Sequence, residues 1–198
     1  MQSDGYKTFD WNFVKIENQD DETISKIILN PQSGNPFGEE DPEYNQTAIS
    51  YKYLMNNGQS FAMEVTGAIE NKENIWIHPP RSNFFALLEL NPFPYIKAPY
   101  KTGTSWNWKL KIGDYWSDKR WLEWKGGIEN IYKYKIREKK IISSKMGMIE
   151  CYIIQAYAKS RIGKTELISY FSPTLGFVKL EYKNIDGSKT VIELEKSE

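Results

Sequence analysis

The feature that most constrains this chain is a strict alternation of apolar and polar residues in several separate stretches. Residues 106–112 (Trp-Asn-Trp-Lys-Leu-Lys-Ile) are apolar at every even position and polar at every odd one. The same period of two recurs in residues 130–137 and 178–183, and in residues 61–69, where Gly67 interrupts it. Successive side chains of a β-strand point to opposite faces, so this period is typical of strands with one buried face. The pattern predicts antiparallel strands, with a bulge at Gly67.

The second half of the chain predicts a meander. Residues 148–158 are apolar at both odd and even positions, which indicates a central strand covered on both faces for part of its length. Asp186-Gly187 lies between the runs 177–183 and 189–194 and is a strong hairpin signal. Connections this short favour sequential strands that pair as antiparallel neighbours.

Helices are predicted only sparsely. Residues 83–90 follow Ser82, a good N-cap, and precede Pro92, so they predict one short helix. Residues 21–29 fit either a short helix or a strand, residues 11–16 predict an N-terminal strand, and residues 30–44 predict a surface loop. We therefore expect a single domain over residues 1–198, mainly β (α+β). Its core element is one curved antiparallel sheet or half-barrel, with one or two short helices on the concave face.

The composition excludes several classes of function. The 198 residues include 26 Lys+Arg, 26 Asp+Glu, one His and one Cys. A net charge of zero argues against a protein that tracks nucleic-acid phosphates and against a polybasic membrane-surface module. One Cys and one His cannot build a thiolate or histidine cluster, so we predict no metal site and no cofactor. The acidic clusters at 20–22 and 39–43 lack the spacing of an EF-hand and indicate solvated loops.

The residues alone are compatible with more than one cellular compartment. No stretch approaches the roughly 18 apolar residues that span a bilayer, so we predict no transmembrane segment. The first residues lack the charged and apolar regions of a signal peptide. The protein is then either cytoplasmic, where a reduced Cys is ordinary, or exported with its leader removed.

Aromatic residues make up 15% of the chain and concentrate between residues 93 and 124, with five of the seven Trp between 106 and 124. Trp106 and Trp108 lie on the apolar face of a predicted strand, and we interpret them as core residues. The less regular stretch after them favours a binding role, because exposed aromatic side chains on loops commonly contact ligands or partners. The aromatic candidates for ligand binding are Tyr95, Tyr115, Trp116, Trp121 and Trp124.

The only histidine, His78, stands three residues before Arg81. A histidine can serve as a general base, and an arginine near it can hold a carboxylate or phosphate. The run 76–81 supplies no nucleophile and no second metal ligand, so we predict no catalytic residue and keep His78 and Arg81 as ligand-binding candidates. Cys151 lies in an apolar strand away from basic residues, which indicates a buried, inert thiol.

Several segments together resemble a family of bacterial envelope proteins. They are Glu89-Leu90-Asn91-Pro92-Phe93-Pro94, Gly103-x-x-Trp106-x-Trp108, Gly147 with Glu150-Cys151-Tyr152, and Tyr170-Phe171 with Gly176-Phe177-Val178-Lys179. The group contains many lipoproteins and is similar in outline to the LolA/LolB-type half-barrel. The resemblance covers roughly residues 85–195. It implies an extracytoplasmic protein, in the periplasm or at the outer membrane, with a lipid anchor in the full-length form, and it implies no catalytic residues.

Three functional hypotheses follow. The leading one is a non-enzymatic envelope module that holds an apolar or amphipathic ligand, or a protein partner, in an aromatic-lined concave groove. The alternative is a carbohydrate-binding or carbohydrate-active protein that uses Trp side chains as sugar platforms. The third is a structural or interaction domain without a ligand.

Overall fold

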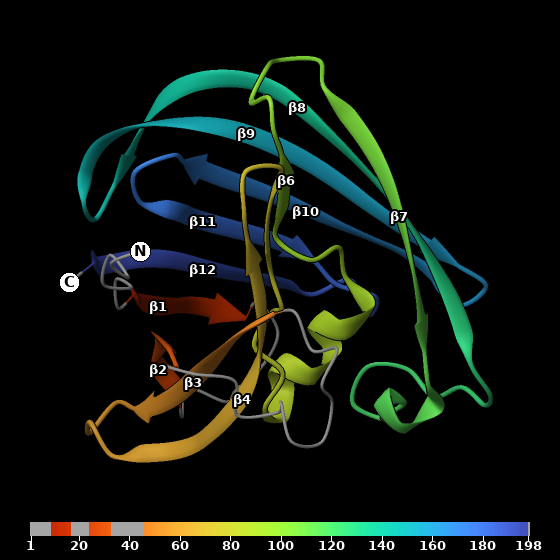
Figure 1. Ribbon diagram of the computed structural model, residues 1–198. Coiled ribbons are helices and arrows are strands. Elements are labelled where there is room, and N and C mark those ends of the chain that lie inside the picture. Colours follow the sequence, from red (N-terminus) through yellow and green to blue (C-terminus); the bar gives the residue numbers. More distant parts are fainter. Residues whose placement is uncertain (1–8, 17–23, 33–45, 198) are drawn as a thin grey trace.

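The computed structural model describes residues 9–16, 24–32 and 46–197, and they form one 12-stranded antiparallel sheet that curls into a half-barrel (Figure 1). The mainly β fold predicted from the alternation is confirmed. The strands are β1 (Phe9–Ile16), β2 (Ile24–Pro31), β3 (Thr47–Met55), β4 (Ser60–Glu70), β5 (Asn74–Ile77), β6 (Tyr95–Lys97), β7 (Ser105–Ile112), β8 (Ile128–Ser144), β9 (Gly147–Ser160), β10 (Gly163–Ser172), β11 (Gly176–Lys183) and β12 (Lys189–Ser197).

The strand order is β6-β5-β4-β3-β2-β1-β12-β11-β10-β9-β8-β7, so every neighbour is sequential except at the β1–β12 junction. The meander predicted for the second half is confirmed, and Gly187 supplies a positive φ of 85° at the β11–β12 turn. The strand predicted to be covered on both faces is β9, but its burial alternates: the buried positions are odd-numbered up to Ile153 and even-numbered from Ile154 onward, so one face is covered at a time. The tip of the β8–β9 hairpin reaches β12, because the Lys145 N–H donates to Glu193 Oε1 at 3.1 Å.

Three sequence expectations change in detail. Residues 21–29 fit either a helix or a strand from sequence, and the strand β2 is what forms, over Ile24–Pro31. Gly67 pairs regularly with Ala48, so the bulge predicted there is wrong; the irregular register lies instead at Tyr53/Leu54, the β3 residues opposite the start of β4. The predicted helix is present as a 3₁₀ helix, η1 (Asn83–Leu90), but Ser82 does not cap it, because its hydroxyl donates to Glu64 Oε2 at 3.0 Å. The acidic clusters and most of the predicted loop lie outside the described residues.

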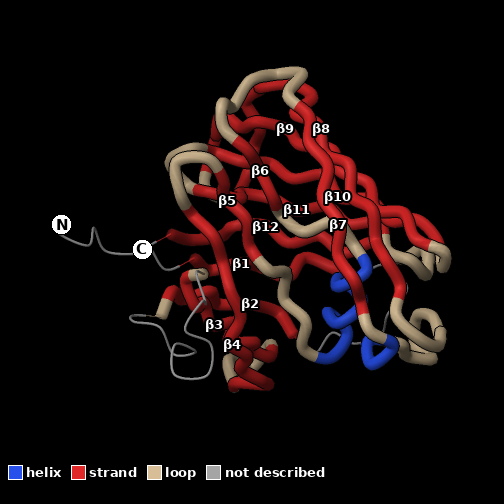
Figure 2. Tube along the Cα trace, turned by 45° about the vertical axis from the view of Figure 1, so that its right-hand side comes forward, coloured by secondary structure: helices blue, strands red, loops and turns tan. Residues whose placement is uncertain are grey.

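The helix η1 lies inside the curl, beside the short 3₁₀ helix η2 (Asp114–Trp116) (Figure 2). Leu87 and Leu88 are fully buried. The last carbonyl of η1, Leu90 O, accepts hydrogen bonds from Asn130 Nδ2 at 3.1 Å and from Thr165 Oγ1 at 2.8 Å. These side chains come from β8 and β10, so polar groups on the inner face of the sheet fix the end of the helix.

The two ends of the sheet approach each other without pairing. Ile69, Trp76 and Tyr95 are cross-strand partners on β4, β5 and β6, so they share one face. Tyr95 packs edge-on against Trp106 and Trp108 of β7, with ring centroids 5.6 and 6.4 Å apart. Among the described strands, β6 pairs only with β5, and β7 only with β8. The ends therefore overlap through side chains.

Candidate functional site

The overlap of the sheet ends is built from five aromatic residues, which we call the aromatic seam: Trp76, Phe93, Tyr95, Trp106 and Trp108. Their rings form a continuous set of contacts, including Trp76–Phe93 at 5.7 Å, Phe93–Trp108 at 5.4 Å and Trp76–Trp108 at 6.1 Å between centroids. Most of these pairs are tilted or edge-to-face, which is the arrangement that aromatic quadrupoles favour. The seam joins residues up to 32 positions apart in sequence and closes the curl on this side.

The inner face of β8 supports the seam from behind. Trp106 stacks on Tyr134 with an interplanar angle of 4°, and Trp108 stacks on Tyr132 at 23°. Both pairs are direct cross-strand partners, so the β7–β8 register holds the two indoles in place. The Tyr134 hydroxyl also donates to Phe93 O at 3.2 Å.

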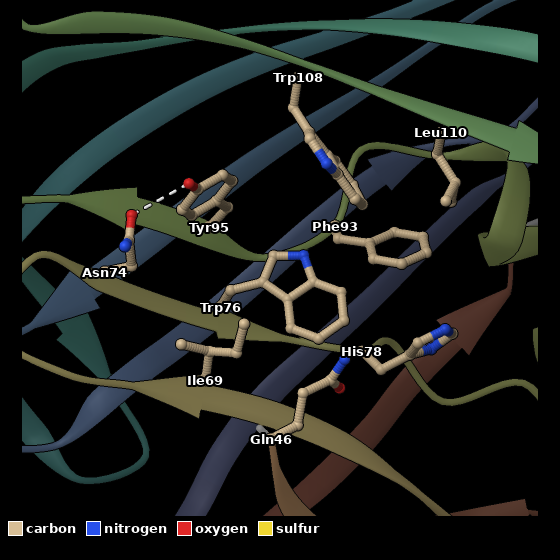
Figure 3. Close-up of a pocket in the computed structure, with 9 residues that line it drawn as sticks. All are labelled: Gln46, Ile69, Asn74, Trp76, His78, Phe93, Tyr95, Trp108 and Leu110. Atoms are coloured by element: carbon tan, nitrogen blue, oxygen red, sulfur yellow. Dashed lines mark hydrogen bonds between the residues drawn. The ribbon is translucent and has the colours of Figure 1, made fainter. Parts of the chain in front are cut away.

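A cavity of about 330 Å³ opens within the seam (Figure 3). This volume lies at the small end of the range for small-molecule sites. The wall is mostly apolar and aromatic, and its polar groups come from the amides of Gln46 and Asn74 and from the His78 imidazole. Tyr95 is fixed there by its hydroxyl, which donates to Asn74 Oδ1 at 3.0 Å. The lining residues are Gln46, Ile69, Asn74, Trp76, His78, Phe93, Tyr95, Trp108 and Leu110.

The Trp76 indole is the central ring of the cavity wall, and its nitrogen lies on the edge toward Phe93 and Trp108 (Figure 3). Trp76 Nε1 is buried and has no hydrogen-bond acceptor among the described residues. Buried polar groups normally have a partner, and leaving one unpaired costs about 1–3 kcal/mol. This donor is covered by the surrounding side chains and does not open to the cavity.

A buried polar cluster adjoins the cavity at His78. Its Nδ1 lies 3.2 Å from Pro79 O, and because a carbonyl only accepts, Nδ1 carries the proton of the neutral ring. Its Nε2 is then an acceptor, 3.3 Å from Arg81 Nη1 and 3.3 Å from Glu89 Oε1. Arg81 Nη1 also lies 3.6 Å from that Glu89 oxygen. Three ionisable side chains thus meet around one imidazole nitrogen.

Burial decides the protonation of this cluster. Desolvation, helped by the Arg81 charge, lowers the pKa of His78 to about 4. Desolvation raises the pKa of Glu89 to about 7, although Arg81 acts in the opposite direction. Between these values the proton resides on Glu89 while His78 is neutral, so the two do not form an ion pair. The remaining positive charge of the cluster belongs to Arg81.

A half-buried carboxylate, Glu64, fixes the chain around Arg81. Its Oε1 accepts from the Tyr53 hydroxyl at 2.9 Å and from the Arg81 backbone N–H at 3.0 Å. Burial raises the pKa of Glu64, and these hydrogen bonds act against that rise. Because its acceptors are used in the turn before η1, Glu64 has a structural role in positioning Arg81.

The structure brings some of the predicted site residues together and separates the others. Tyr95 and His78 line the cavity, and Arg81 lies directly behind His78. Trp116 of η2 is linked to them through Arg81, whose guanidinium lies 5.9 Å from the indole centroid. Tyr115 is 78% exposed and does not line the cavity.

Trp121 and Trp124 are each 8% exposed, so the loop exposure that suggested a binding role for them is absent. The reason is local hydrogen bonding: Trp121 Nε1 donates to Trp116 O at 3.2 Å, and the Trp124 N–H donates to Ser117 Oγ at 2.9 Å. These bonds fold the segment 114–124 onto the core cluster.

The residues that sequence reasoning did not select for the site are Ile69, Asn74, Trp76, Phe93, Trp108 and Leu110, together with Gln46. Trp108 was expected in the core; it is only partly buried and its ring reaches the cavity. The sequence signal for this site is the presence of aromatic residues in two short runs, 93–95 and 106–108, that flank one turn. Cys151 is fully buried as expected, and burial raises the pKa of its thiol to about 11. No helix within the described ranges is long and apolar enough to cross a membrane.

Comparisons with known proteins support the fold. No protein-family model matches the chain, and no curated protein matches its sequence. Among solved structures, the chain is similar to a candidate lipoprotein from Parabacteroides distasonis ATCC 8503, with a TM-score of 0.58, 12% identity, and coverage of 98% of this chain and 95% of that one. It is also similar to a candidate exported protein with a YmcC-like fold from Bacteroides fragilis NCTC 9343, with a TM-score of 0.50, 9% identity, and coverage of 98% and 96%. At such identities the likeness establishes a shared fold.

Proposed function

We propose that this protein is a non-enzymatic binding module of the bacterial cell envelope that holds an apolar or amphipathic small molecule in the cavity of the aromatic seam. The observation that carries the proposal is the cavity itself, about 330 Å³ in volume, with Trp76, Phe93 and Trp108 in its wall. Small-molecule sites are typically concave, largely apolar and supplied with a few fixed polar groups. The Asn74 and Gln46 amides are such groups here.

The ligand class follows from the wall. The cavity wall carries no charge near pH 7, because the low pKa of His78 keeps its ring neutral. The preferred ligand therefore carries no net charge at its buried end. A hydroxyl on an apolar chain or ring would pair with the Asn74 or Gln46 amide of the wall. Sugar binding is less well supported, because two of the three expected platforms, Trp121 and Trp124, are buried and the third, Trp116, is half-buried.

The proposed location is extracytoplasmic. It rests on the resemblance of the sequence segments to envelope proteins and on structural neighbours described as a lipoprotein and as an exported protein. A lipid anchor in the full-length form and a relationship to LolA/LolB-type half-barrels belong to the same proposal.

The test is a titration with 1-decanol and 10-bromo-1-decanol, neutral amphiphiles that each carry one acceptor oxygen. Decanol binding is measured by calorimetry, and the brominated analogue is followed by heavy-atom quenching of tryptophan fluorescence. We expect saturable 1:1 binding with partial quenching, because Trp76 and Trp108 line the cavity while Trp121 and Trp124 do not. Maltohexaose and cellohexaose serve as sugar probes in the same assay.

A matched pair of substitutions locates the binding. Ile69→Phe fills the cavity from β4, whereas Ile131→Phe adds the same atoms on β8, where Ile131 is 39% exposed. We expect Ile69→Phe to weaken decanol binding at least tenfold and Ile131→Phe to leave it unchanged. Equal effects of both changes, no saturable binding of decanol, or tighter binding of a hexasaccharide would contradict the proposal.

A further inference from the structure

The outer face of strands β7 to β10 is strongly basic although the chain has no net charge. Its exposed cationic side chains come from four adjacent strands, and we call them the basic face: Lys109 and Lys111 of β7, Lys133, Lys135 and Arg137 of β8, Lys159 of β9 and Lys164 of β10. The carboxylates on this face are Glu129, which lies 3.1 Å from Lys109 Nζ, the half-buried Glu166, and Glu138 at the far end of β8, which lies 3.0 Å from Lys140 Nζ.

The register places these charges side by side. Lys133 is the cross-strand partner of Tyr157, and Ile131 is the partner of both Lys109 and Lys159. Lys159 is in turn directly opposite Lys164. Neighbouring strands are about 4.8 Å apart, and alternate residues along a strand about 6.8 Å apart, so the charges lie close enough to repel one another.

Protection of a sheet edge explains only part of this charge. Lysines on an edge strand prevent pairing with other chains, and Lys109 and Lys111 lie on β7, which is an edge. Lys133, Lys135 and Lys159 lie on β8 and β9, which are paired on both sides. None of these three lysines has a carboxylate within ion-pair distance in the described part of the chain. Like charges placed opposite each other weaken a sheet, so this arrangement suits an external polyanion.

Two apolar side chains lie within the basic face. Ile131 is 39% exposed and Tyr157 is 43% exposed, and the Gln155 amide donates to the Tyr157 hydroxyl. Tyr157 is amphipathic, Ile131 is aliphatic, and lysines surround both. Such a combination is typical of the membrane-contacting surfaces of peripheral proteins. The cations are six lysines and one arginine, and lysine acts as a point charge where arginine recognises phosphate by a fixed fork. The face therefore favours a broad anionic surface over a single phosphate or a base sequence.

We propose that the basic face docks on the surface of an anionic phospholipid bilayer, with Ile131 and Tyr157 contacting the headgroup region. Basic clusters of this size attract anionic lipids through their surface potential. This inference concerns the outer face of the sheet and is independent of the ligand proposed for the cavity, so either can fail without the other.

The test is co-sedimentation of the folded protein with vesicles of equal parts phosphatidylglycerol and phosphatidylcholine, compared with pure phosphatidylcholine vesicles. We expect at least tenfold tighter binding to the anionic vesicles at 50 mM NaCl and loss of that difference at 500 mM, because salt screens exposed charges. Free glycerol phosphate at millimolar concentration should not compete. Competition by glycerol phosphate, or equal binding to both vesicle types, would overturn the proposal.

A matched pair of double variants localises the contact. Lys133→Glu/Lys135→Glu reverses two charges of the basic face, and Lys52→Glu/Lys72→Glu makes the same net change at exposed sites near the other end of the sheet. The first pair should weaken vesicle binding by about thirtyfold or more, since each lysine near an anionic surface contributes about fivefold. The second pair should weaken it less than threefold.

Circular dichroism of both double variants checks that they are folded. Equal losses in the two double variants would contradict a localised face. Salt-sensitive binding to a 30-nucleotide RNA without binding to vesicles would overturn the membrane assignment in favour of a nucleic-acid partner.

Discussion

The inner and outer faces of the β7–β8 pair carry opposite chemistry on the same two strands. Inside, Trp106 and Trp108 stack on Tyr134 and Tyr132. Outside, the residues between them are lysines and polar side chains exposed to solvent. One register thus produces an aromatic wall around a cavity and a basic outer surface. Substitutions one residue apart on these strands should therefore act on different properties. Those on the inner face should change stability and ligand binding, and those on the outer face should change association with a surface.

The largest expected effect is on stability at the inner face. Trp106→Ala should lower the free energy of unfolding by about 3–5 kcal/mol, because it removes a buried ring that stacks on Tyr134 and contacts Tyr95. Lys133→Ala, on the outer face of the partner strand, should change it by less than about 0.5 kcal/mol. Urea unfolding at pH 7 measures both. Similar losses for the two variants would contradict the assignment of faces.

The next effect concerns the protonation of the buried pair His78 and Glu89. In the folded protein between pH 4 and pH 7, Glu89 holds one proton and His78 none. In the unfolded chain, whose ordinary pKa values are about 4.3 and 6.5, His78 holds the proton over most of this window and Glu89 does not. The pair therefore binds one proton in both states, and its contribution to stability is nearly independent of pH.

Removing one partner should reveal the other. In Glu89→Gln, the lowered pKa of His78 means that the folded state binds fewer protons, so stability should fall as the pH drops from 6.5 to 4. In His78→Gln, the raised pKa of Glu89 means that the folded state binds more protons, so stability should fall as the pH rises from 4.5 to 7. Each change should amount to about 2 kcal/mol. Urea unfolding across this range checks the opposite slopes, and parallel slopes would refute the proton assignment.

A smaller effect concerns the hydrogen bond that holds Tyr95 in the cavity wall. Tyr95→Phe removes the hydroxyl that donates to Asn74 Oδ1 at 3.0 Å and keeps the ring in the aromatic seam. We expect a loss of about 1 kcal/mol in stability with the contacts to Trp106 retained. Near-ultraviolet circular dichroism, which reports aromatic packing, should stay close to the parent spectrum. A collapse of that signal would mean that the hydroxyl controls the packing of the seam.

The smallest effect is a gain on the outer face. Lys164→Glu replaces the direct Lys159–Lys164 cross-strand pair by a pair of opposite charges. Stability should rise by about 0.5 kcal/mol at low salt, and the gain should shrink at 500 mM NaCl. Thermal unfolding at the two salt concentrations measures it. A salt-independent loss would show that Lys164 contributes through packing and not through charge.

The sequence predicted the strands well because alternation is a local property: residues 106–112 and 130–137 show on which face each side chain lies. The overlap of the sheet ends could not be predicted, because it depends on β5 and β6 packing against β7, and no local pattern relates Trp76 to Trp108. The burial of Trp121 was missed for a related reason. Irregular spacing indicates a loop, but the bond from its indole to Trp116 O holds that loop against the core.

The most direct test of the central claim is a crystal structure of the protein soaked with 10-bromo-1-decanol, with data collected at the bromine absorption edge. We expect one dominant anomalous peak inside the cavity, bordered by Trp76 and Trp108, with the alcohol oxygen within hydrogen-bond distance of the Asn74 or Gln46 amide. A dominant peak elsewhere, for example on the exposed strip of β4 formed by Phe61, Met63 and Val65, would contradict it, as would an empty cavity at saturating probe.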